Sequence, residues 1–162
     1  KCRVQQTPML NQTLKTKVFA TLTALTATFF LAPTAVRADN SRYVNDIGRQ
    51  LARAATAAGL GGYTRTHKPF IDLLTHGRSH YITLNLRAGT SYGIVGVCDR
   101  DCRDLDIALL DSYGNVIASD LQDDDIPFIR INPNYSGSYR IRVDMANCNT
   151  NSCYYGIGTF GQ

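Results

Sequence analysis

The chain has 162 residues and carries 17 Lys and Arg against 13 acidic residues, all of them Asp, for a net charge of +4. Five basic residues lie in an N-terminal segment that we expect to be removed, so residues 39–162 hold 12 positive and 13 negative charges. A net charge near −1 excludes nucleic acid as an expected partner, and a chain of this length suits a single domain.

The N-terminal segment has the pattern of a secretory signal peptide. Lys15 and Lys17 supply positive charge, and residues 18–32 form an uncharged, mostly apolar run. Val36 and Ala38 then place small or modest side chains at the two positions that a signal peptidase reads. We therefore predict cleavage after Ala38 and a secreted or periplasmic protein.

An uncleaved membrane anchor is the alternative interpretation of this segment. A spanning helix needs about 20 apolar residues, more than this run provides, and no stop-transfer stretch follows it. We expect no stable membrane span after processing. The predicted organisation is an upstream extension and signal peptide at 1–38, a helix with a Gly-rich link at 39–62, and a β-sandwich domain at 63–162.

Residues 41–58 are predicted to form one amphipathic helix. Asn40 or Ser41 can cap it, and glycines from Gly59 onward end it. Apolar side chains recur at helical spacing along one face, at Val44, Ile47, Leu51, Ala54, Ala55 and Ala58. We expect this helix to dock on the domain, with a loosely attached partner-binding arm as the alternative.

From Tyr63 onward the apolar residues recur at every second position, which is typical of strands with one face in the core. The clearest strands are expected at residues 80–86, 105–109 and 139–145, and weaker ones at 70–74, 92–97, 116–119, 128–131 and 154–160. About eight short strands separated by turns predict a mainly all-β fold, an antiparallel β-sandwich or jelly roll preceded by one N-terminal helix.

Four cysteines remain after processing: Cys98, Cys102, Cys148 and Cys153. In an exported chain an even number of cysteines indicates two disulfides, for which three pairings are possible. The local pairing, Cys98 with Cys102 and Cys148 with Cys153, is favoured because each pair is close in sequence and lies in a turn-rich stretch. A four-thiolate zinc site is the alternative, but its paired cysteines are usually separated by two residues.

Three stretches resemble the bacterial pre-peptidase C-terminal domain family. They are "LRAGTSYGIVGV", "DLDIALLDSYGNVIASD" and "INPNYSGSYRIRVDM", and the likeness covers roughly residues 68–160. The resemblance implies a small β-sandwich of exported proteins, usually appended to a secreted peptidase, in which some members bind calcium through aspartates near the D-x-D strand. What it carries over to this chain is the fold, export and a binding role.

Calcium is the one metal that the aspartates indicate, because it takes six to eight oxygen ligands. Asp104 and Asp106 share the outward face of one strand, and a disulfide-closed loop would hold two more carboxylates beside them. The predicted ligands are Asp99, Asp101, Asp104, Asp106, Asp123 and Asp125. The alternative is a solvated acidic loop whose aspartates cap turns and pair with neighbouring arginines.

No residue pattern predicts catalysis. The three histidines, His67, His76 and His80, lie in turn or strand sequence rather than at helical metal-site spacing, and no nucleophile elbow, metalloprotease helix or phosphate loop occurs. Tyrosines in or near loops are candidates for a binding face or for half-buried strand positions: Tyr81, Tyr113, Tyr135, Tyr154 and Tyr155.

The sequence therefore predicts a secreted, non-catalytic binding or accessory module with an extracellular or periplasmic protein or glycan as its partner and with calcium stiffening its Asp-rich edge. Two alternatives remain open. One is a structural or protein-interaction domain without metal, in which the helix is the docking element. The other is a small hydrolase whose site the sequence does not reveal.

Overall fold

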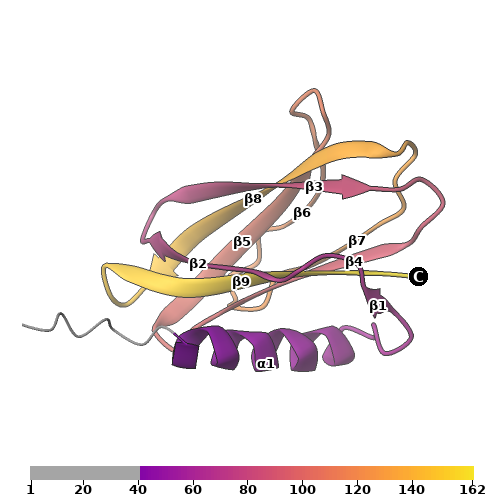
Figure 1. Ribbon diagram of the computed structural model, residues 1–162. Helices are drawn as coiled ribbons and strands as arrows, with labels where there is room; N and C mark the ends of the chain where they lie inside the picture. The colour runs from indigo at the N-terminus through magenta and orange to yellow at the C-terminus, as the bar shows by residue number, and fades with distance from the viewer. Residues whose placement is uncertain (1–40) are drawn as a thin grey trace, which may run out of the picture. The chain divides into compact units, whose positions relative to one another are not determined.

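A computed structural model describes residues 41–162 of the chain (Figure 1). The predicted signal peptide and its cleavage after Ala38 lie outside these residues. Within the described residues, no helix has the length and apolar character that crossing a membrane would need.

One helix and nine strands follow each other along the chain. They are α1 (Ser41–Ala57), β1 (Thr64–Arg65), β2 (Phe70–Thr75), β3 (Ser79–Leu86), β4 (Tyr92–Cys98), β5 (Cys102–Leu110), β6 (Val116–Asp120), β7 (Phe128–Ile131), β8 (Gly137–Cys148) and β9 (Ser152–Gly161). All eight predicted strands and the predicted helix are confirmed. The two-residue β1 was not predicted, because so short an edge segment carries no alternation that a sequence could reveal.

The strands form two antiparallel sheets. The five-stranded sheet has the order β1-β9-β4-β7, with β2 also paired to β9, and the four-stranded sheet has the order β3-β8-β5-β6. Their inner faces enclose the main core, in which Leu105, Ile107 and Val143 have no solvent exposure. This is the predicted β-sandwich, and Figure 1 shows α1 lying along the outside of the five-stranded sheet.

The helix buries its apolar stripe against β4 and β9 in a second core. Ile47 and Leu51 are nearly inaccessible there and pack with Val95 and Val97 of β4. Val44, which was predicted to share this face, is instead 42% exposed. The helix is thus a docked element of the domain, as the apolar spacing predicted.

A glycine in β9 sets how close the helix lies to the sheet. A Cβ atom on Gly156 would fall inside van der Waals contact with the Cγ2 atom of Ile47. The missing side chain lets Ile47 seat directly on the strand, which is the kind of close approach for which glycine is used in strands. The glycines of this strand therefore have a packing role that sequence reasoning had not assigned to them.

Candidate functional site

The turn between β4 and β5 is closed by a disulfide from Cys98 to Cys102. Inside it, the Asp99 carboxylate accepts hydrogen bonds from the backbone N–H groups of Asp101 (3.2 Å) and Tyr154 (2.8 Å). The Asp99 N–H in turn donates to the Tyr154 carbonyl oxygen at 2.9 Å. The covalent link and these three bonds fix the turn against β9.

The second disulfide, from Cys148 to Cys153, lies beside the first. Cys102 and Cys148 are register partners on β5 and β8, and the Asn149 N–H donates to the Asp101 carbonyl oxygen at 2.8 Å. The structure therefore has the local pairing that the sequence favoured, and it places both closed turns at one end of the sandwich. Disulfide-bonded cysteines cannot serve as thiolate ligands, so the four-cysteine zinc alternative is not supported.

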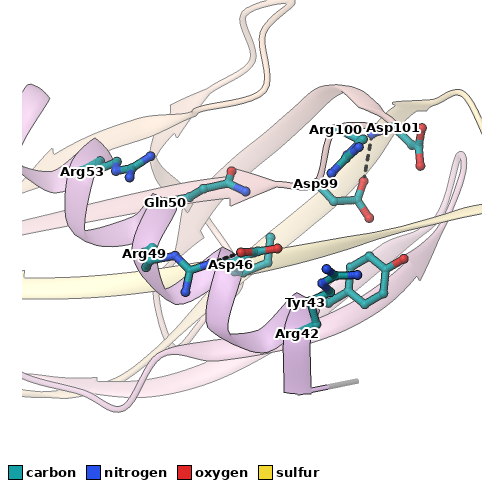
Figure 2. Close-up of a pocket in the computed structure, with 10 residues that line it drawn as sticks. Arg42, Tyr43, Asp46, Arg49, Gln50, Arg53, Asp99, Arg100 and Asp101 are labelled. Carbon is teal, nitrogen blue, oxygen red and sulfur yellow. Dashed lines mark hydrogen bonds and ion pairs between the residues drawn. The ribbon is translucent and has the colours of Figure 1, made fainter. Parts of the chain in front are cut away.

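A hollow of about 960 Å³ opens between α1 and the β4–β5 turn (Figure 2). Arg42, Arg49 and Arg53 line it from the helix, and Arg100 lines it from the turn. The three helix positions are spaced by seven and then four residues, so they fall on one stripe of the helix surface. We call this hollow the helix–turn groove.

Acidic and aromatic residues share the helix–turn groove with the arginines. Asp46 lies in the same helix stripe and pairs with Arg49. Tyr43 closes one end, where its ring stacks on that of Tyr154 with 4.6 Å between centroids. Because the Asp99 carboxylate is already held by backbone N–H groups, the groove presents more guanidinium than free carboxylate.

Asp104 and Asp106 lie elsewhere, on the outer face of β5 in the four-stranded sheet. Burial first, and then the carboxylates of Asp123 and Asp124, raise the pKa of Asp104 above its ordinary value. For Asp106, burial again comes first among the causes that raise the pKa. The carboxylates of Asp104, Asp144 and Asp120 raise the pKa of Asp106 further, and Arg142 lowers it. We call the surface formed by Asp104, Asp106 and the neighbouring Asp120, Asp123 and Asp124 the acidic edge.

Neighbouring carboxylates at the acidic edge already hold backbone groups. Asp120 Oδ2 accepts from the Phe128 N–H, and Asp124 Oδ1 accepts from the Ile126 N–H, both at 2.9 Å. Asp104 differs, since its Oδ1 atom is buried and has no hydrogen-bond partner among the described residues. A buried acceptor without a partner costs free energy, so this oxygen is the one best placed to gain from a cation.

The structure does not bring the six aspartates predicted as calcium ligands together: two lie in the groove, three at the acidic edge, and one in the loop before β7. Asp99 and Asp101 line the helix–turn groove beside arginines, whereas Asp104, Asp106 and Asp123 belong to the acidic edge. Asp125, the sixth, is exposed in the loop before β7, and its carbonyl oxygen lies 3.7 Å from the Cys98 sulfur. Across residues 41–162 no three His, Cys, Asp or Glu side chains converge as a metal-binding group.

The three histidines occupy separate structural positions. His76 Nδ1 accepts from the Cys148 N–H at 3.0 Å, and His67 Nε2 donates to the Asn85 carbonyl oxygen at 3.1 Å. His80 Nδ1 lies 2.5 Å from the Tyr155 hydroxyl oxygen. Each ring therefore serves a local contact between segments.

The candidate tyrosines do not gather on one face. Tyr155 is fully buried, and burial raises the pKa of its hydroxyl. Tyr154 stacks beneath the helix, whereas Tyr81, Tyr113 and Tyr135 are exposed on different elements. For Tyr154 and Tyr155 on the last strand, a position at least half buried in the strand was therefore a better interpretation than an exposed binding face.

No protein-family profile matches the chain, and no curated protein matches it. Among solved structures it is similar to the periplasmic inhibitor of g-type lysozyme from Aeromonas hydrophila, at 12% identity and a TM-score of 0.45, over 59% of this chain and 85% of that one. It is also similar to the pre-peptidase C-terminal domain of a collagenase from Bacillus anthracis, at 14% identity and a TM-score of 0.47, over 59% and 89%. Likenesses at this level leave membership of the pre-peptidase C-terminal family a prediction.

Proposed function

We propose that this protein is a non-catalytic binding module that works outside the cytoplasm and holds an acidic segment of a partner protein in the helix–turn groove. The observation that carries the proposal is the set of four arginines, from two separate elements, that line one open hollow. Arginine suits such a role because its planar fork binds a carboxylate with two parallel hydrogen bonds.

The spacing of the arginines favours an extended ligand. Arg42 and Arg53 are eleven positions apart on α1, which at the rise of a helix is about 16 Å. An extended peptide covers that distance with about five residues. Arg100 lines the same hollow from the turn, on the side of Arg42 and Tyr43 (Figure 2), so a carboxylate at that end of such a peptide would find guanidinium groups from both elements.

Two features support a location outside the cytoplasm and a binding role there. The two disulfides are of a kind that persists in oxidising compartments, which supports a secreted or periplasmic location. The histidines, the most common general bases of enzymes, are each engaged in contacts between structural segments, which supports a binding rather than a catalytic role.

Calcium at the acidic edge is the second component of the proposal. Asp104 would be its central ligand, because its buried Oδ1 atom has no protein partner and carboxylate oxygens are what calcium prefers. Because no three acidic side chains converge among the described residues, Asp106, Asp123 and the loop around Asp125 would have to close around the cation, with carbonyl oxygens and water as the remaining ligands. Burial first, and then repulsion between carboxylates, raises the pKa values of Asp104 and Asp106, and a cation there would offset both by favouring the charged form.

Fluorescence anisotropy of a labelled octaglutamate peptide tests the groove. The triple variant Arg42→Gln/Arg53→Gln/Arg100→Gln should weaken binding roughly tenfold, since three exposed pairs of about 0.5 kcal/mol each are lost. The matched control, Arg65→Gln/Arg78→Gln/Arg87→Gln, removes the same charge from exposed arginines elsewhere and should stay within about twofold of the wild type.

Two results would count against this proposal. Equal weakening in both triple variants would mean that net charge, not the groove, attracts the peptide. A sulfated heparin oligosaccharide that binds far more tightly than the peptide, and whose binding the groove triple abolishes, would assign a glycan rather than a protein partner.

A further inference from the structure

The sandwich has an apolar cavity at the edge where β2 and β3 face each other across the two sheets. The cavity measures about 280 Å³, close to the roughly 300 Å³ at which small-molecule pockets begin. Phe70, Ile82, Leu84, Ile141 and Ile157 form its apolar walls.

The cavity exists because the edge strand of one sheet is interrupted. The Thr66 N–H still bonds to Thr159 on β9, and pairing resumes only where Phe70 meets Ile157. Three residues, 67–69, therefore stand opposite a single residue of β9. Pro69 cannot donate a backbone hydrogen bond, so this segment leaves the ladder here and lines the cavity together with the core side chains.

Thr83 and Thr159 also line the cavity, but the charged and ring-nitrogen groups lie at its mouth. His67 spans it, with its Nε2 atom donating to the carbonyl oxygen of Asn85 on the other sheet at 3.1 Å. Lys68 follows on the rim, is exposed, and has no acidic partner among the ion pairs of the described residues. One fixed polar bridge and one available cation thus lie at the entrance to an apolar interior.

We propose that this cavity binds the alkyl chain of a small carboxylate amphiphile, a medium-chain fatty acid in chemical class, with its carboxylate at Lys68. The apolar walls exclude a charged or strongly polar ligand from the interior, because burying such a group without partners is costly. The single cation at the rim selects an anionic head group over a neutral one. The site is separate from the helix–turn groove and does not depend on the function proposed for it.

Methyl-resolved NMR of the full chain, titrated with octanoate, tests the proposal. The δ1 methyl signals of Ile82, Ile141 and Ile157 should shift together, whereas that of Ile47 under the helix should not. Hexanoate should bind more weakly, since each methylene removed costs roughly a threefold to fourfold loss of affinity. The neutral analogue 1-octanol should bind through the same methyl groups but more weakly than octanoate.

Two variants separate the cavity from surface charge. Lys68→Gln should lower octanoate affinity roughly threefold or more, to the level of 1-octanol, whereas Arg78→Gln, an exposed cation in the β2–β3 turn, should leave it unchanged. Ile82→Phe fills the cavity and should abolish both ligands' methyl shifts, with a retained amide spectrum as proof of folding. Absent shifts at the three isoleucines, or equal losses in Lys68→Gln and Arg78→Gln, would overturn the proposal.

Discussion

The same short stretch of chain, residues 99–106, contributes aspartates to both the helix–turn groove and the acidic edge, yet the two regions carry opposite charge. Asp99 and Asp101 lie in the closed turn that faces α1, among arginines. Asp104 and Asp106, only a few residues later, lie on the outer face of the other sheet, among carboxylates. A cluster of charged residues in a sequence therefore does not by itself define a site. Which charged groups surround each residue depends on whether it lies in the turn or on the strand that follows it.

The two regions also use their carboxylates differently. Asp99 is satisfied by two backbone N–H groups and acts as a structural anchor, whereas Asp104 keeps a buried oxygen without a partner. One carboxylate stabilises the fold, and the other is a cost that a ligand can repay.

Displacing the helix should cause the largest loss in the free energy of unfolding. Gly156→Val places a side chain where Ile47 now packs, and overpacking of this kind costs about 2–3 kcal/mol. Chemical denaturation should show this loss, and octaglutamate binding to the groove should weaken with it while the acidic edge is unaffected. Gly61→Val, at a glycine whose added Cβ meets no neighbour, is the control, and a loss of the same size there would refute the packing argument.

Removing the anchor carboxylate should give the next largest effect. Asp99→Ala leaves the part-buried Tyr154 N–H and the Asp101 N–H without their acceptor, at a cost of about 1–2 kcal/mol. Asp101→Ala should change stability by less than about 0.5 kcal/mol, because its side chain is exposed. Thermal unfolding of the two variants compares them directly, and similar losses would show that Asp99 has no special role.

At the acidic edge, in contrast, removing a carboxylate should stabilise the protein. Asp104→Asn removes one member of a repulsive cluster, so at neutral pH the free energy of unfolding should rise, by up to about 1 kcal/mol. If calcium binds at the acidic edge as proposed, millimolar calcium should raise the melting temperature of the wild type, and the variant should lose most of that rise. A destabilised Asp104→Asn protein with an intact calcium response would contradict both expectations.

The smallest expected change in stability comes from the protonation of Asp104 and Asp106 as the pH falls. The pKa values of Asp104 and Asp106 are raised by folding, so the folded state binds more protons, and their contribution to stability grows as the pH falls from neutral toward the raised pKa values. The stability gap between Asp104→Asn/Asp106→Asn and the wild type should therefore narrow at mildly acidic pH. Asp111, whose pKa is lowered chiefly by its bond with Asn115, opposes this trend in both proteins equally.

The elements of the fold were accessible from the sequence because their signals are local. Alternation such as that of Leu105 and Ile107 marks a strand with one buried face, and the apolar stripe of Ile47 and Leu51 marks the docked helix. The disulfide pairing followed from cysteines close in sequence. The short β1 and the packing role of Gly156 stayed hidden, since both depend on what β9 meets after folding.

The site was predictable only in part, because it depends on contacts between distant segments. The sequence singled out Asp99 to Asp106 but could not show that the chain turns from one sheet to the other between them. The arginine stripe was visible in principle, since Arg42, Arg49 and Arg53 recur at helical spacing. What no spacing could reveal is that Arg100, in a turn closed by a disulfide, faces that stripe.

Amide NMR of the protein titrated with calcium tests most directly whether the two regions are distinct. We expect shifts at Asp104, Asp106 and the Asp123–Asp125 loop, and none at Asp99, Asp101 or the first turns of α1. Shifts concentrated at Asp99 and Asp101 would contradict it, because they would place the cation in the groove that the arginines line.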